Sequence, residues 1–245
     1  MVRLSVTQLE AMTPEERLDI TQLMMCNMGL FQFPRVILTC TNLKLLRINM
    51  NMITSVPREL GNLVNLKGLY LEDNKLTSIP RELGTLVNLK ILRLGDNRLT
   101  SIPRELGNLV NLKGLYLDNN KLTSIPRELG NLVKLEEFNL NYNEIMSISR
   151  EFRNLVSLRT IHLFSNQLRK IPCELGDIEN LEWIYSGHNV KLTSIPRELD
   201  NVIINNDTIG VSDNPRFSVT ARDTIDRIVG KNTFSDLGRL CARFV

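Results

Sequence analysis

The stretch Leu66–Asn88 reads LKGLYLEDNKLTSIPRELGTLVN, and Leu112–Lys134 repeats it almost letter for letter as LKGLYLDNNKLTSIPRELGNLVK. The same 23-residue interval separates Asn51, Asn74, Asn97, Asn120, Asn143, Asn166 and Asn189. Near-identity over this length cannot come from composition, so the chain consists of tandem copies of one unit. One unit cannot bury its own apolar face, so the copies must stack and share a core.

Each unit contains two apolar periodicities. Around Leu69 and Leu71, apolar and polar residues alternate, which predicts a short strand. From Ile79 onward, apolar residues recur at intervals of four and three, which fits a short helical turn beginning near Pro80. Proline suits the first helical position because that residue needs no N–H donor.

Stacking aligns the predicted strands into a parallel sheet with the helical turns behind it. Strands lie about 4.8 Å apart, whereas packed helical segments need about 8–10 Å. The sequence therefore predicts an α/β solenoid, a horseshoe with the parallel sheet on its concave face and short helical or 3-10 turns on its convex face. The repeated asparagine can donate to and accept from unpaired backbone groups, which predicts an amide ladder along the stack.

The skeleton L-x-x-L-x-L-x-x-N-x-L, followed by T-S-I-P-R-E-L-G-N-L-V-N, resembles the leucine-rich-repeat family. It is most similar to the intracellular 23-residue type of the plant and animal Ras-group repeat proteins. The I-P-R-E-L-G-N-L wording also looks like plant receptor-kinase ectodomains, but those usually have 24 residues and a Gly before Ile-Pro. Arrays of nearly identical copies also resemble the repeat proteins of large DNA viruses. The resemblance implies docking of signalling proteins such as GTPases or phosphatases.

The pattern divides the chain into three parts. Residues 1–19 are predicted as an N-terminal helical cap, with capping boxes at Ser5-x-x-Gln8 and from Thr13 to Glu16. Residues 20–217 are predicted as nine repeats of about 23 residues, and residues 218–245 as a C-terminal helical cap. The ninth repeat is recognisable mainly by Ile209, Val211 and Asn214. An apolar stripe in the last segment either seals the final repeat or docks a partner: Phe234, Leu237, Leu240, Cys241 and Phe244.

Composition limits the class of partner and the compartment. The net charge of +3 gives no concentrated basic excess, so we expect no nucleic-acid partner. We find no apolar segment of signal-peptide or membrane-spanning length and therefore expect no membrane association. The four cysteines are scattered, which suits a reducing compartment. The sequence thus predicts an intracellular, cytoplasmic protein.

The candidate binding site consists of the strand residues whose side chains point outward from the sheet. Their residue types vary between units that are otherwise nearly identical, so the scaffold does not dictate them. Six of the 13 aromatic residues fall at these positions. Tyr, Trp and Arg are enriched at binding hot spots, although aromatic residues also stack on one another across strands. The predicted partner-binding residues are Arg47, Tyr70, Arg93, Tyr116, Tyr142, His162, Phe164, Trp183, Tyr185 and His188.

The sequence contains no phosphate-loop motif, no H-E-x-x-H zinc-protease motif and no G-x-S-x-G nucleophile elbow. His162 and His188, placed on adjacent predicted strands, make a weak metal site without a third ligand. We predict neither enzyme activity, cofactor nor metal. The leading hypothesis is a monomeric scaffold that binds another protein on its concave face. The alternative is a structural or assembly component, for example of a viral particle, that uses edge, convex or cap surfaces. Independently of both hypotheses, the lysine column at Lys44, Lys67, Lys90 and Lys113 is either a solvated edge or a stripe that binds acidic groups.

Overall fold

The computed structural model describes residues 2–205. It begins with the two-residue strand β1 (Val2–Arg3) and two short helices, α1 (Val6–Ala11) and α2 (Pro14–Leu18). Both predicted capping boxes are confirmed: Ser5 and Thr13 each accept from the backbone N–H three residues on, while Gln8 and Glu16 accept from the cap. Leu9 of α1 is fully buried, so the helices cover the core of the first unit.

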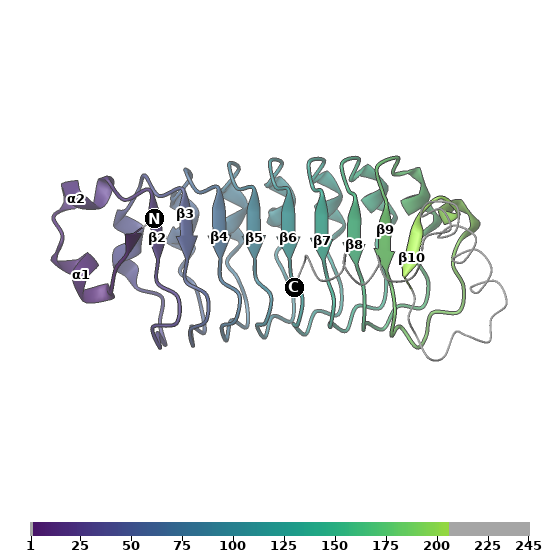
Figure 1. Cartoon of the computed structure of the whole chain (residues 1–245), viewed down its shortest axis with the longest axis horizontal. Helices are drawn as coiled ribbons and strands as arrows, with labels where there is room; N and C mark the ends of the chain where they lie inside the picture. Colours follow the sequence, from purple (N-terminus) through teal and green to yellow (C-terminus); the bar gives the residue numbers. More distant parts are fainter. Residues whose placement is uncertain (1, 206–245) are drawn as a thin grey trace, which may run out of the picture.

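A single parallel sheet runs the length of the molecule in chain order, from β1 to β10 (Figure 1). Each strand after β1 has three residues and pairs with the strands of the adjacent units. This confirms the predicted parallel solenoid. The strands are β2 (Gln22–Met24), β3 (Leu45–Arg47), β4 (Gly68–Tyr70), β5 (Ile91–Arg93), β6 (Gly114–Tyr116), β7 (Glu137–Asn139), β8 (Thr160–His162), β9 (Trp183–Tyr185) and β10 (Ile203–Asn205).

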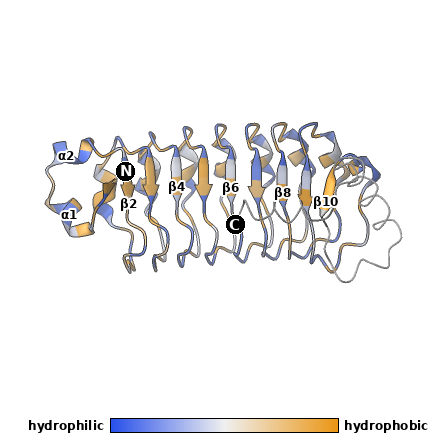
Figure 2. Cartoon of the chain, in the orientation of Figure 1, coloured by the Kyte–Doolittle hydropathy of each residue, from blue (hydrophilic) through white to orange (hydrophobic). Residues whose placement is uncertain are grey.

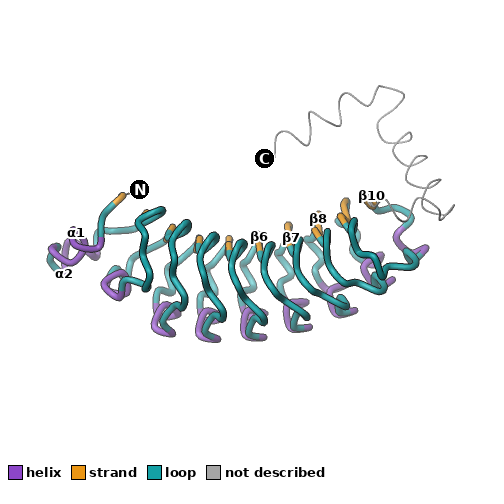
Figure 3. The backbone as a smooth tube through the Cα atoms, turned by 90° about the horizontal axis from the view of Figure 1, so that it is seen from below, coloured by secondary structure: helices purple, strands orange, loops and turns teal. Residues whose placement is uncertain are grey.

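The convex side is made of 3-10 turns, one per unit. They comprise Arg35–Thr39, Arg58–Asn62, Arg81–Thr85, Arg104–Asn108, Arg127–Asn131, Arg150–Asn154, Cys173–Asp177 and Arg197–Leu199. Pro80 and its equivalents stand at the N-cap, one residue before the turn begins, and not at the first helical position as predicted. Figure 3 shows the strands along the inner side of a shallow arc and the turns along its outer side.

The apolar residues of every unit join one continuous core, and Figure 2 shows the hydropathy pattern recurring from unit to unit. In unit three, Leu69, Leu71 and Leu76 are fully buried. Burial of apolar surface at roughly 25 cal/mol per Å² stabilises the stack, and most of that surface lies between units.

The asparagine ladder is confirmed. Asn97 donates through Nδ2 to the carbonyl of Leu94 in its own unit at 3.1 Å and to that of Leu71 in the preceding unit at 3.0 Å. Its Oδ1 accepts from the N–H of Leu76, also in the preceding unit, at 3.0 Å. Each ladder asparagine therefore satisfies backbone groups of two units where the strands end.

The loop after β9 differs from the equivalent loops of the earlier units. Val190 lies in this loop and is 82% exposed. Strand β10 begins directly after the buried Val202 and pairs with β9. The residues expected to mark the ninth unit, Ile209 and Val211, follow this strand and lie outside the described residues, as does the predicted C-terminal cap at 218–245.

Candidate functional site

In strands β2 to β9 the middle residue is buried and the third residue is half-buried on the inner face. The register of the sheet places the third residues side by side, from β3 through β9. This inner row brings six of the ten predicted site residues into one line. They are Arg47, Tyr70, Arg93, Tyr116, His162 and Tyr185, with Asn139 between Tyr116 and His162.

The first half of the inner row is an alternating stack of guanidinium groups and phenol rings. The Arg47 guanidinium carbon lies 4.4 Å from the centroid of the Tyr70 ring, and that of Arg93 lies 4.1 Å from the centroid of Tyr116. Cation–π contacts of this kind stabilise by about 0.5–1 kcal/mol each at exposed sites. The side chains of this half are therefore positioned before any partner binds.

Glycine is required beside these rings. A Cβ on Gly114 would lie 2.8 Å from the Tyr116 ring, and one on Gly68 would lie 3.0 Å from the Tyr70 ring. The two tyrosines therefore lie against the strand backbone, two residues after the glycine. This contact explains why the two tyrosines are half-buried. The sequence pattern alone predicts freely exposed positions for them.

Glu137 links the two halves of the inner row. Tyr116 donates through Oη to Glu137 at 2.6 Å, and the other carboxylate oxygen lies 3.7 Å from Nε2 of His162. Burial and this hydrogen bond raise the pKa of the Tyr116 hydroxyl. Burial lowers the pKa of His162, and the charge of Glu137 only partly opposes that effect. His162 is accordingly neutral at pH 7.

Beyond Glu137 lies an aromatic cluster, formed by His162 and Tyr185 of the inner row and by Trp183, the first residue of β9. The rings of His162 and Tyr185 are stacked with centroids 4.8 Å apart and planes 4° from parallel. The rings of Trp183 and Tyr185 are 5.9 Å apart and 10° from parallel. The rings stack on one another, as one predicted alternative requires. They also remain half-buried on the inner face, so part of each ring is still accessible, as the binding alternative requires.

Three predicted residues are not on strands. Tyr142, Phe164 and His188 lie in the loops that follow β7, β8 and β9, so the placement of His162 and His188 on adjacent strands was wrong. The strands are only three residues long, and the chain turns just before each ladder asparagine. The three side chains still meet: Tyr142 and Phe164 lie 5.4 Å apart and Phe164 and His188 lie 4.6 Å apart, between ring centroids.

The turn gives Tyr142 and His188 left-handed backbones, with φ of 53° and 55°. Among the sister units, Asp73, Asp96 and Asn119 are residue types that tolerate that conformation, whereas Met50 and Ser165 share it without being Asp or Asn. Tyr142 likewise adopts it at a conformational cost.

Acidic groups near the Arg–Tyr stack were missed from the sequence. Burial, more than any other cause, raises the pKa of Glu72, Asp96 and Asp118. Neighbouring carboxylates add to the effect: Asp118 for Glu72, Asp73 for Asp96, and Asp96 for Asp118. Glu72 and Asp118 stand two residues after Tyr70 and Tyr116, so extending the strand alternation by one step would have identified them.

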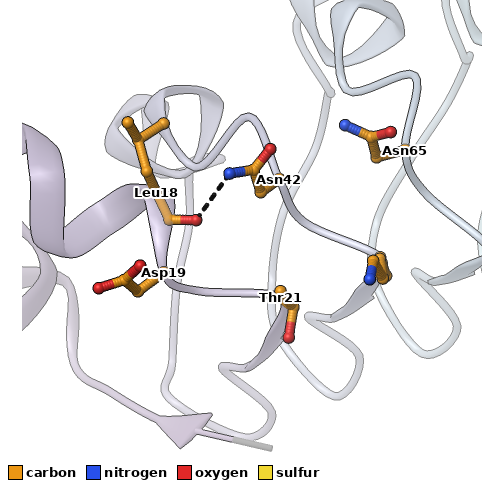
Figure 4. Close-up of a pocket in the computed structure, with 6 residues that line it drawn as sticks. Leu18, Asp19, Thr21, Asn42 and Asn65 are labelled. Atoms are coloured by element: carbon orange, nitrogen blue, oxygen red, sulfur yellow. Dashed lines mark hydrogen bonds between the residues drawn. The ribbon is translucent and has the colours of Figure 1, made fainter.

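A shallow hollow of about 360 Å³ lies where α2 meets the first units (Figure 4). Asn42 donates through Nδ2 to the carbonyl of Leu18 at 3.0 Å, and Thr21, Lys44 and Asn65 complete much of its wall. It contains none of the predicted site residues. Its open shape and mixed polar lining differ from the enclosed, mostly apolar sites that hold small molecules.

Two further observations apply to residues 2–205 alone. Within that range, no three side chains among His, Cys, Asp and Glu converge as metal ligands would. Across the same range, no helix has both the length and the apolar character needed to cross a bilayer.

Together, the parallel sheet, the 3-10 turns and the asparagine ladder define a leucine-rich-repeat solenoid. The profile of the family described as "Leucine-rich repeat region" matches residues 20–217. The chain belongs to this family. A comparison with curated proteins by sequence finds no match.

Solved structures share the fold. A leucine-rich-repeat protein of Leptospira interrogans is 30% identical, with a TM-score of 0.67 over 86% of this chain and 58% of its own. A plant peptide hormone receptor, RGFR1, solved in complex with RGF2, is 32% identical, with a TM-score of 0.62 over 71% of this chain and 29% of its own. An internalin of Listeria monocytogenes is 22% identical with a TM-score of 0.50 and shows the fold alone. This chain thus spans little more than half of the first relative and under a third of the second.

Proposed function

We propose that the protein is a non-catalytic interaction module that binds another protein on its concave face. The observation that carries the proposal is the aromatic cluster of His162, Trp183 and Tyr185 on strands β8 and β9. It includes the single Trp of the chain, Trp183, at a register position where the units before it carry Gln, Leu, Gly, Ile, Glu or Thr. Large, rigid aromatic side chains lose little conformational entropy on binding and form typical hot spots.

The loop residues Tyr142, Phe164 and His188 extend this surface past the ends of the strands. Tyr142 is 49% exposed although aromatic, and it occupies a left-handed backbone that favours Asp or Asn. Strain of this kind is retained where a side chain serves a function. The receptor complex among the structural relatives shows that a protein of this fold can occur with a bound peptide hormone.

The test is affinity capture with mass spectrometry from a lysate of the source organism. We compare the wild type with a Phe164→Ala, Trp183→Ala, Tyr185→Ala variant and with a convex control, Arg81→Ala, Arg104→Ala, Arg127→Ala. The proposal predicts a protein retained by the wild type and by the convex control but lost from the aromatic variant.

Circular dichroism establishes that all three proteins are folded. Capture of the same proteins by all three would contradict the proposal. Self-capture alone would also contradict it and would favour an assembly component acting through its edges, convex side or caps.

A further inference from the structure

We propose a second interaction surface on the edge where the strands begin, fitted to an acidic amphipathic helix of a partner protein. This strand-start edge connects each 3-10 turn to the next strand. It consists of a valine column and a lysine column running along the solenoid. The valines are Val64, Val87, Val110, Val133 and Val156, and the lysines are Lys44, Lys67, Lys90 and Lys113.

A second asparagine ladder holds this edge in place. Asn88 donates through Nδ2 to the carbonyl of Val64 at 3.0 Å, and Asn111 donates to that of Val87 at 2.9 Å. Asn65 makes the same contact with Thr41 at 3.0 Å. These bonds tie the connecting loops of units two to four to the preceding loops, so this part of the edge is a preorganised surface and not a series of free loops.

The valine column is exposed in every unit that has it. The five side chains retain 42–54% of their surface. A single exposed valine needs no explanation. Five exposed valines at the same position of consecutive units make a row of apolar side chains along this edge, which fits apolar side chains of a partner.

The lysine column is aligned by backbone hydrogen bonds. Lys67 and Lys90 each donate through the backbone N–H to the carbonyl of the preceding lysine, at 2.7 and 2.8 Å. Parallel strands lie about 4.8 Å apart, so the like charges are closely spaced. Among residues 2–205, no carboxylate lies within 4 Å of the ammonium groups of Lys44, Lys67 or Lys90.

The later units show the opposite arrangement. Lys113 pairs with Glu136 at 2.6 Å, and Arg159 pairs with Glu182 at 2.8 Å. From Lys113 onward the column is neutralised by the chain itself. The unpaired lysines of this column are therefore confined to units two to four, which also carry Val64, Val87 and Val110. Their ammonium groups can pair with carboxylates of a partner protein.

The spacing favours a helix over an extended segment. Along an α-helix, one face presents a side chain at each turn of about 5.4 Å, close to the lysine spacing of about 4.8 Å. Along a strand, same-face side chains recur at about 6.6 Å and would fall out of register. The expected partner helix lies along the solenoid with Asp or Glu facing the lysines and apolar residues facing the valines.

The probe is a fluorescein-labelled synthetic peptide of about 15 residues, with Glu once per turn beside a Leu face. Binding is followed by fluorescence anisotropy at low salt, with a scrambled peptide of equal composition alongside. The test variant is Lys44→Gln, Lys67→Gln, Lys90→Gln. Its matched control, Arg58→Gln, Arg81→Gln, Arg104→Gln, removes the same charge from the convex turns.

We expect the lysine variant to bind the probe about tenfold more weakly than the wild type and the arginine control to bind it normally. A Val64→Thr, Val87→Thr, Val110→Thr variant should bind it several-fold more weakly. The proposal is overturned if the wild type does not bind the probe or if the lysine variant binds it unchanged. Equal binding of the scrambled peptide, or of a single-stranded oligonucleotide, also overturns it, since either would indicate a general polyanion surface. Thermal unfolding checks that each variant is folded.

Discussion

At the scale of single residues, the ladder asparagines determine where each unit turns. Asn120 donates through Nδ2 to Leu94, Leu117 and Asp118. Its Oδ1 accepts from the N–H of Leu99 at 2.9 Å. No other side chain of similar size both donates and accepts at these positions, so the residue type is dictated by the backbone of two units.

Replacing Asn120 with Ala leaves several buried backbone groups without partners. We expect the free energy of unfolding to fall by about 3 kcal/mol. Asn111→Ala removes two exposed hydrogen bonds, one donated to the carbonyl of Val87 and one accepted from Lys134, and should cost about 1 kcal/mol. Urea denaturation of the two variants measures both values, and equal losses would contradict the role assigned to the ladder.

The half-buried carboxylate of Asp118 destabilises the folded protein when it is charged. Its pKa is raised in the folded protein, chiefly by burial, so the folded state holds the proton more tightly than the unfolded chain does. The charge therefore lowers stability above the raised pKa, and that penalty fades as the pH falls through it. Asn141 occupies the equivalent position one unit later, where its Oδ1 accepts from the N–H of Phe164 at 2.8 Å.

Asp118→Asn should stabilise the protein by about 0.5–1 kcal/mol at pH 7. The gain should shrink as the pH falls through the raised pKa of Asp118, because the wild-type carboxylate then becomes protonated. Thermal unfolding of both proteins across this pH range is the measurement. A gain that is independent of pH would show that the carboxylate charge is not its source.

At the scale of elements, two kinds of glycine perform different tasks. A Cβ on Gly107, in a 3-10 turn, would lie 2.3 Å from the backbone oxygen of Glu128 in the next unit. A Cβ on Gly114, in β6, would meet only the ring of Tyr116. The first obstacle is backbone fixed by stacking, and the second is a side chain that can rotate away.

Gly107→Ala should therefore destabilise the protein by about 3 kcal/mol or more, because two stacked units must separate. Gly114→Ala should cost about 1 kcal/mol and should displace Tyr116 from its contact with Arg93. Chemical denaturation gives both energies, and tyrosine fluorescence reports the displaced ring. A larger loss for Gly114→Ala would contradict the stacking geometry.

Much of the element structure could be predicted from the sequence. The 23-residue period fixed the parallel strands, the turns and the inner row, because each follows from periodicity and the burial of leucines. The loop positions of Tyr142, Phe164 and His188 could not be predicted, because the left-handed turn before the ladder asparagine has no hydrophobic signal. The role of Glu137 was also missed. Its contacts with Tyr116 on one neighbouring strand and His162 on the other depend on side-chain conformations, which the sequence pattern does not specify.

At the scale of the whole molecule, contacts between elements run from each unit to the next. Stability is then a sum of unit and interface terms, and opening can begin at an end. Leu9 in the N-terminal cap and Leu115 in the central strand β6 are both fully buried. Because the two leucines are equally buried but lie at an end and in the middle of the solenoid, their substitutions distinguish local opening from unfolding of the whole molecule.

Leu9→Ala and Leu115→Ala should each cost about 2–5 kcal/mol locally. Hydrogen exchange should show Leu9→Ala lowering protection mainly in the cap and the first units. Leu115→Ala should lower protection on both sides of β6. Uniform loss of protection in both variants would indicate an all-or-none molecule and not a chain of coupled units.

The central claim is that the concave face binds a protein partner, and site-specific photo-crosslinking tests it most directly. A benzophenone amino acid is placed at Tyr185 on the inner row or, as a control, at Arg104 on the convex side. Each protein is irradiated in a lysate of the source organism. We predict that one protein is crosslinked from position 185 and not from position 104. Crosslinking of the same protein from both positions, from position 104 alone, or of no protein from position 185 would contradict the claim.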